Sequence, residues 1–145
     1  MRAMGGFYFV TGGTRAGGYT GAQLPHGAGA WTTLSDRNSK EHILPVDARE
    51  VLRKVAVLPI ATWNWKSQDP MISHMGPMAQ DFHAAFGLGE TPKGISTVDS
   101  EGVALAAIQG LHQLVQEKDR EIAQLKAWKE TLEQKLEAIE AKLGM

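Results

Sequence analysis

The sequence predicts an α+β protein made of three consecutive parts. Residues 1–34 are rich in glycine and aromatic residues and contain short stretches that favour β-strands. Residues 35–100 alternate between helical and strand patterns, as expected of a small mixed domain. Residues 101–145 repeat apolar residues in heptads, which predicts one long helix that pairs with other helices. A chain of 145 residues has room for one modest domain with an extension of this kind.

The first part contains nine of the chain's 16 glycines. Residues 7–10 and 30–33 are typical of short strands, and Gly-Gly pairs between them are typical of turns. Such a segment has too little apolar surface to stand alone, so we predict the end of a β-rich body whose strands need partners. A flexible linker is the alternative. Aromatic residues are unusual in solvated linkers and favour the strands; they are Phe7, Tyr8, Phe9, Tyr19 and Trp31.

The middle part opens with a helix. Asp47 followed three residues later by Glu50 resembles a capping box, and Pro59 ends the apolar periodicity that follows. Residues 60–65 are rich in β-branched and aromatic residues, which predicts a strand.

The middle part then returns to a helical pattern. The spacing predicts a helix over 78–86 with Gly87 as its C-terminal stop. Residues 95–98 read as a short strand, and Asp99 or Ser100 is the expected cap of the final helix.

Residues 101–143 form a heptad pattern that persists for about five heptads, enough to predict a coiled coil. At about 1.5 Å per residue such a helix is roughly 65 Å long, too long to fold back on so small a domain. Lys118 and Lys129 interrupt the apolar a and d positions, where they would weaken the seam and fix its register. The rules for a and d residues leave dimer and trimer open, and a single amphipathic helix packed on its own domain is the alternative. The apolar seam consists of Ile108, Leu111, Val115, Ile122, Leu125, Leu132, Leu136, Ile139 and Leu143.

Composition narrows the functional classes. The formal net charge of −1 favours neither nucleic acid nor an acidic membrane surface as a partner. The absence of cysteine excludes disulfides, thiol catalysis and thiolate metal sites. The five histidines show no metal-ligand spacing, and no apolar stretch is long enough to span a membrane. We therefore expect no metal and no cofactor.

Ser35 and Lys40 are the chemical candidates. Serine–lysine pairs are a known variant of the serine–histidine–aspartate arrangement, but a serine near a lysine is common and usually structural. Lysine is protonated in neutral water, so Lys40 could act as a base only if burial or a neighbouring positive charge removed its proton. On an ideal helix an offset of five residues places the two side chains about 140° apart. Either the segment leaves the helical path, or Lys40 meets Ser35 of another chain.

Four ordered motifs resemble one family, the intramolecular chaperone auto-processing domain. This family forms the C-terminal domain of phage endosialidases, tailspikes and tail fibres, of related bacterial proteins and of the animal myelin regulatory factor. The resemblance covers roughly residues 31–115. The motifs are SDRNSKE at 35–41, LPIATWNWK at 58–66, HMGPMAQDF at 74–82 and ISTVDSEGVALAAIQGL at 95–111.

The resemblance implies a self-cleaving serine peptidase that acts once. The scissile bond would be Leu34–Ser35, with Ser35 as nucleophile and Lys40 as general base. Asp36 would shape the turn, and His74 would either support catalysis or pack as a structural residue. The implied domains are a stalk end at 1–34, a chaperone core at 35–100 and a coiled-coil helix at 101–145.

The resemblance also implies the partners. The protein would be a homotrimer whose folding client is the β-rich stalk upstream on the same polypeptide, without nucleic acid or membrane. Its place would be the phage virion tail, or the host cytoplasm during assembly, with a bacterial prophage as another source. Two other functions stay open: a permanent trimeric cap that is not cleaved, and a receptor- or glycan-binding fibre tip with Trp63 and Trp65 as the sugar platform.

Overall fold

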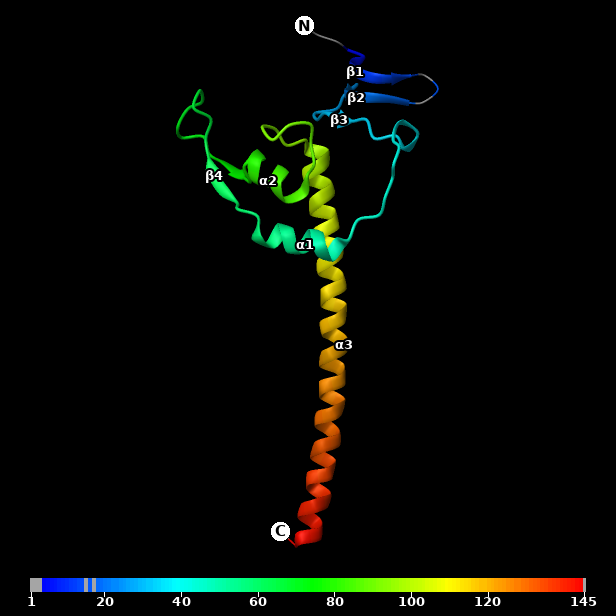
Figure 1. Ribbon diagram of the computed structural model, residues 1–145, viewed down its shortest axis with the longest axis vertical. Helices are drawn as coiled ribbons and strands as arrows, with labels where there is room; N and C mark the ends of the chain where they lie inside the picture. The colour runs from blue at the N-terminus through cyan, green and yellow to red at the C-terminus, as the bar shows by residue number, and fades with distance from the viewer. Residues whose placement is uncertain (1–3, 15, 17, 145) are drawn as a thin grey trace. The chain divides into compact units, whose positions relative to one another are not determined.

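The computed structural model describes residues 4–14, 16 and 18–144, and confirms the mixed α+β class. The chain divides into two compact units, Met1–Pro45 and Val46–Met145 (Figure 1). The first contains an antiparallel sheet, and the second contains a small hairpin and three helices. This division reflects packing alone. The boundary expected at Leu34–Ser35 concerns where the chain is cut, so it stays a prediction.

The N-terminal unit is a three-stranded antiparallel sheet in the order β1-β2-β3. Its strands are β1 (Gly6–Thr14), β2 (Gly18–Pro25) and β3 (Thr32–Thr33). The strand expected at 7–10 is therefore confirmed within β1, and the strand expected at 30–33 is reduced to two residues. The structure shows a sheet where the alternative was a flexible linker.

Strand β2 has no counterpart in the sequence prediction. Its sequence, GYTGAQLP, lacks the alternation of apolar and polar residues that marks a half-buried strand. It is held by pairing with β1, from Gly6 opposite Pro25 to Thr14 opposite Gly18. The expectation that Gly12 and Gly13 form a turn was wrong, because both lie inside β1 after a bulge between Val10 and Gly12.

The C-terminal unit begins with helix α1 (Ala48–Val57), which the sequence predicted. Asp47 is its N-cap: the carboxylate oxygen Oδ1 accepts hydrogen bonds from the backbone N–H groups of Arg49 (2.9 Å) and Glu50 (3.0 Å). After α1, the short strand β4 (Ala61–Trp63) pairs antiparallel with β5 (His74–Gly76).

Helix α2 (Ala79–Phe86) follows, and Gly87 ends it in the left-handed conformation, as expected. The strand expected at 95–98 was wrong, because helix α3 (Thr97–Leu143) already begins there. The cap expected at Asp99 or Ser100 was wrong as well, since Ser96 is the N-cap. The Ser96 carbonyl accepts from the backbone N–H groups of both, which draws the β-branched residues into the first turn.

The core of this unit is small and lies where α1 crosses α3 (Figure 1). Four residues of α3 recur at helical spacing and are buried, namely Val103, Ala106, Ala107 and Gly110. Among the described residues of the unit, Ala48 of α1 and Phe82 of α2 are the other buried ones. Small side chains at this crossing allow the two helix backbones to approach closely.

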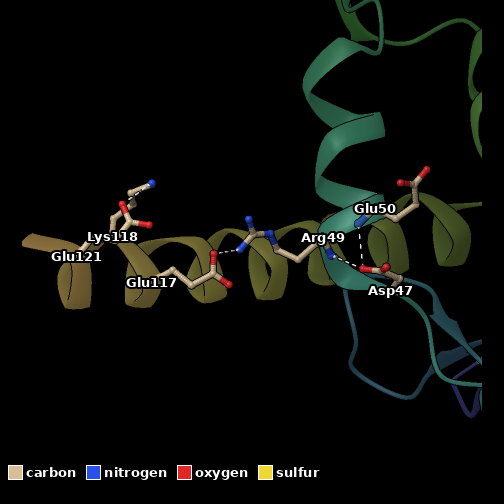
Figure 2. A network of polar contacts seen from close by, with 6 residues as sticks. All are labelled: Asp47, Arg49, Glu50, Glu117, Lys118 and Glu121. Atoms are coloured by element: carbon tan, nitrogen blue, oxygen red, sulfur yellow. Dashed lines mark hydrogen bonds and ion pairs between the residues drawn. The ribbon is translucent and has the colours of Figure 1, made fainter.

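An ion pair ties the same two helices together farther along α3. Arg49 Nη1 donates to Glu117 Oε2 at 2.7 Å (Figure 2). Asp47, which caps α1, lies beside Arg49, so cap and ion pair share one end of α1 (Figure 2).

Helix α3 has 47 residues and is therefore about 70 Å long. All nine apolar seam residues are exposed, from 43% at Leu132 to 69% at Leu143. The helix does pack on its own unit, but through the face of Val103 and Gly110. A single helix packed on its own domain therefore does not account for the seam.

Candidate active site

Residues 35–40, hereafter the 35–40 turn, contain a short 3₁₀ helix, η1 (Arg37–Ser39). Asp36 caps it: its Oδ1 accepts from the backbone N–H of Asn38 at 3.0 Å and from Asn38 Nδ2 at 3.1 Å. Ser39 Oγ donates to the Asp36 carbonyl at 2.8 Å. The Lys40 N–H donates to the Arg37 carbonyl at 3.1 Å and ends the turn. Local hydrogen bonds of Asp, Asn and Ser thus bend this segment out of the α-helical path.

The turn brings Ser35 and Lys40 together. Lys40 Nζ donates to Ser35 Oγ at 2.5 Å within one chain. An α-helix would have kept the two side chains apart. Of the two arrangements left open by the spacing, the structure therefore has the bent segment.

Both members of this pair are exposed in the single chain. An amine surrounded by water carries its proton at neutral pH, and an ammonium group can donate a hydrogen bond but cannot accept a proton. The two side chains are therefore within hydrogen-bond reach of each other. Contact with further protein that excludes water from Lys40 is the change that would favour its neutral form.

Leu34, directly before Ser35, is anchored to the sheet. Strand β3 pairs with β2 through Thr32 opposite Gln23 and Thr33 opposite Ala22. The Leu34 N–H continues this pairing by donating to the Gly21 carbonyl at 2.9 Å. The Leu34–Ser35 bond thus follows directly on the last pairing of the sheet.

His74 lies in β5, in the C-terminal unit, whereas Ser35 and Lys40 lie in the N-terminal unit. Its Nε2 is 2.8 Å from Gln68 Oε1, and its ring packs on Trp63 with centroids 4.9 Å apart. These contacts give His74 a packing role. A supporting role in catalysis stays a prediction.

Trp63 and Trp65 touch edge to face, with centroids 5.0 Å apart and planes at 80°. They line a pocket of about 530 Å³ together with Met78 and Lys93. Rings at this angle do not offer one flat face to a sugar, so the geometry does not favour the glycan platform. The Trp63 indole N–H is buried without a hydrogen-bond partner in the described chain.

Two further observations concern metal ions and membranes. Among the described residues, no group of three or more histidines and carboxylates is placed to hold a metal ion. Within the same residues, no helix is both long and apolar enough to cross a membrane.

The sequence reasoning missed the supports of the turn. Asn38 and Ser39 both form hydrogen bonds with Asp36, and the Gly21 carbonyl accepts a hydrogen bond from the N–H of Leu34. The order Asp-x-Asn-Ser is typical of turns that side chains stabilise, and this signal could have indicated the first two residues. Nothing in the sequence marks Gly21, because its partner is set by strand pairing.

Comparison with known proteins agrees with the resemblance. Residues 35–88 match the family model described as chaperone of endosialidase, peptidase family S74. The match begins at Ser35 and confirms the predicted resemblance over the residues it covers. A comparison with curated proteins finds no match to this chain.

Proposed function

Because residues 35–88 belong to the chaperone-of-endosialidase family, we propose that the chain is the C-terminal intramolecular chaperone of a β-rich fibre or tailspike. It brings three chains together, assists the folding of the upstream stalk and then releases itself by cutting Leu34–Ser35. One observation carries the proposal: Lys40 Nζ lies 2.5 Å from Ser35 Oγ, and Ser35 is the first residue of the family match.

The proposed reaction begins when neutral Lys40 takes the proton of Ser35 Oγ. The oxygen attacks the Leu34 carbonyl carbon and forms a C–O bond, and the C–N bond to Ser35 then breaks. Lys40 returns the proton to the departing Ser35 nitrogen, which becomes a free amine. Water hydrolyses the resulting ester to a Leu34 carboxylate and restores the Ser35 hydroxyl. Nucleophile and target are neighbours in the chain, so no second reactant has to be captured.

Timing follows from the exposure of Lys40. In one chain Lys40 is exposed to water, and its Nζ donates a hydrogen bond to Ser35 Oγ. Further chains that cover the 35–40 turn would desolvate Lys40 and favour its neutral form. Cleavage would then follow assembly rather than precede it.

Assembly is supported by the exposed seam of α3. Its nine apolar residues recur at coiled-coil spacing, and apolar surface of this extent in water favours association. Lys118 and Lys129 lie on the seam, and each pairs with a glutamate of its own helix, Glu121 at 2.7 Å and Glu133 at 3.2 Å. We propose that three such helices form a parallel coiled coil whose register these lysines fix.

The chaperone role has a physical reason. The N-terminal unit exposes Tyr8, Phe9 and Trp31, so part of its apolar surface is uncovered in one chain. Stalks built from strands of several chains fold slowly because their contacts are non-local, and their open edges aggregate. A coiled coil raises the local concentration of the three stalks and aligns their ends. Its removal leaves a stalk whose stability is kinetic.

The test is the mass of the expressed chain. The parent should yield a fragment that begins at Ser35, and Ser35→Ala and Lys40→Ala should yield only intact chain. Lys40→Arg keeps the positive charge but not the ability to lose a proton, so it should also stay intact. Lys126→Ala, on α3 outside the seam, is the control that should still cleave.

A permanent cap is the second candidate, because Lys40 is exposed in the single chain, whereas base catalysis by a lysine requires that water be excluded from it. It predicts an intact parent chain under conditions in which trimers are present. That result, from a mass spectrum and sedimentation of the same sample, would overturn self-cleavage.

The proposed location follows from the client. A stalk of this kind belongs to a phage virion tail, and the chaperone part acts in the host cytoplasm during assembly, from a phage or a prophage.

A further inference from the structure

Strand β2 supports the chain on both sides of the Leu34–Ser35 bond. Before the bond, the Gly21 carbonyl accepts the N–H of Leu34 at 2.9 Å. After it, Gly18 lies against Ser39 in the 35–40 turn. One short strand thus contacts the residue that would be acylated and the turn that carries the proposed base.

The contact at Gly18 requires glycine. Its φ is +80°, a conformation that residues with a side chain rarely adopt. A Cβ built there would lie 3.0 Å from Ser39 Cβ and 3.4 Å from both Ser39 N and Asp36 Oδ2. A side chain at this position would press on the turn, and Ser39 would have to move by a few tenths of an ångström.

A displaced turn would act on the pair directly. Ser39 Oγ donates a hydrogen bond to the Asp36 carbonyl at 2.8 Å, and Lys40 is the next residue in the chain. Asp36 in turn is the neighbour of Ser35 and caps η1. Gly18 therefore lies against Asp36 and Ser39, which are the neighbours of Ser35 and Lys40 within the turn.

We propose that Gly18 is a positioning residue for self-cleavage, and that β2 is the template on which the 35–40 turn takes its reactive form. This rests on the proposed function. It adds that cleavage depends on folding of the sheet. The 35–40 turn takes its reactive form only when β2 has formed, and β2 is stabilised by its pairing with β1. The chain would thus cut itself only after the end of its stalk has formed.

The experiment follows the appearance of the fragment beginning at Ser35 over time in cell-free synthesis of the full chain. Gly18→Ala is compared with Gly27→Ala. Gly27 has nearly the same φ, +75°, but a Cβ there meets nothing within 4 Å. Both variants place a side chain at a positive φ, and only Gly18→Ala adds a contact with the turn. We expect Gly18→Ala to slow cleavage several-fold, because Ser39 would have to move by a few tenths of an ångström and reaction rates depend steeply on such positioning, and Gly27→Ala to cleave at nearly the parent rate.

A second substitution separates positioning from folding. Ser39→Gly removes the Cβ nearest to position 18 but also the hydrogen bond to the Asp36 carbonyl, so Ser39→Gly alone is the reference, and Gly18→Ala should slow cleavage less on that background than on the parent. A loss of folding at β2 would not be repaired by a change in the turn. Circular dichroism and sedimentation of the same variants on the uncleaved Ser35→Ala background should match the parent.

The outcomes are distinct. A parent chain that does not yield the Ser35 fragment overturns the proposed function itself. A parent chain that cleaves, with Gly18→Ala as fast as Gly27→Ala, overturns only the positioning role. Equal slowing by Gly18→Ala on the parent and on the Ser39→Gly background overturns it as well.

Discussion

Gly110 of α3 lies directly against Ala48 of α1. A Cβ at position 110 would stand 2.2 Å from the Ala48 carbonyl oxygen and 2.7 Å from its carbonyl carbon. Both residues are buried, so the crossing of the two helices depends on a glycine that no side chain can replace without moving a backbone.

Gly110→Ala should therefore destabilise the C-terminal unit by about 1–3 kcal/mol, because the added methyl group overpacks the crossing. Gly102→Ala is the matched control on the same helix, where a Cβ meets nothing within 4 Å. It should stabilise by about 0.5–1 kcal/mol through helix propensity. Urea unfolding on the Ser35→Ala background measures both, and equal midpoints would contradict the close contact.

The ion pair of Arg49 and Glu117 should contribute little. Their side chains are 39% and 51% exposed, so solvent screens the 2.7 Å contact. A double-mutant cycle with Arg49→Met and Glu117→Gln should give a coupling of about 0.2–1 kcal/mol, and less in high salt. A coupling that salt does not reduce would show that the pair is buried in the assembled protein.

The seam predicts a contrast between neighbouring positions of α3. Ile122→Glu places a charge on the apolar seam, whereas Gln124→Glu adds the same residue two positions away at heptad position c. We expect the first to convert oligomers to monomers and the second to leave them intact. Sedimentation equilibrium measures both, and an unchanged oligomer in Ile122→Glu would exclude this seam.

Asp36 should affect the rate of cleavage because its side chain caps η1. Asp36→Ala removes the acceptor for both donors of Asn38, which lie at 3.0 and 3.1 Å, so η1 loosens and cleavage should slow several-fold or more. Asp36→Asn keeps an oxygen there and should cleave at close to the parent rate. Time courses of the Ser35 fragment measure this, and equal slowing by both variants would indicate that the carboxylate charge is what counts.

The sequence predicted the elements whose signals are local. Asp47 and Pro59 bracket α1, Gly87 ends α2, and the heptads mark most of α3. It failed where pairing or capping overrides propensity. Strand β2 is specified by β1 rather than by its own residues. The β-branched residues after Ile95 become helical because Ser96 starts a turn there.

The same distinction applies to the candidate site. Ser35, Asp36 and Lys40 form one motif within six residues, so the sequence could indicate them together. The roles of Gly18 and Gly21 depend on which strand lies beside the turn, and no local pattern records that.

The position of Leu34 at the end of the sheet has a consequence for the products of the proposed cut. Every strand of the sheet described, and the pairing partner of Leu34, lies on the N-terminal side of the bond. No hydrogen bond between strands has to break for the two fragments to part. The new carboxyl-terminal residue would keep its hydrogen bond to Gly21, and the departing fragment would carry its side of the contact with Gly18. The stalk would end in a strand that stays paired with its neighbour up to the new carboxyl terminus.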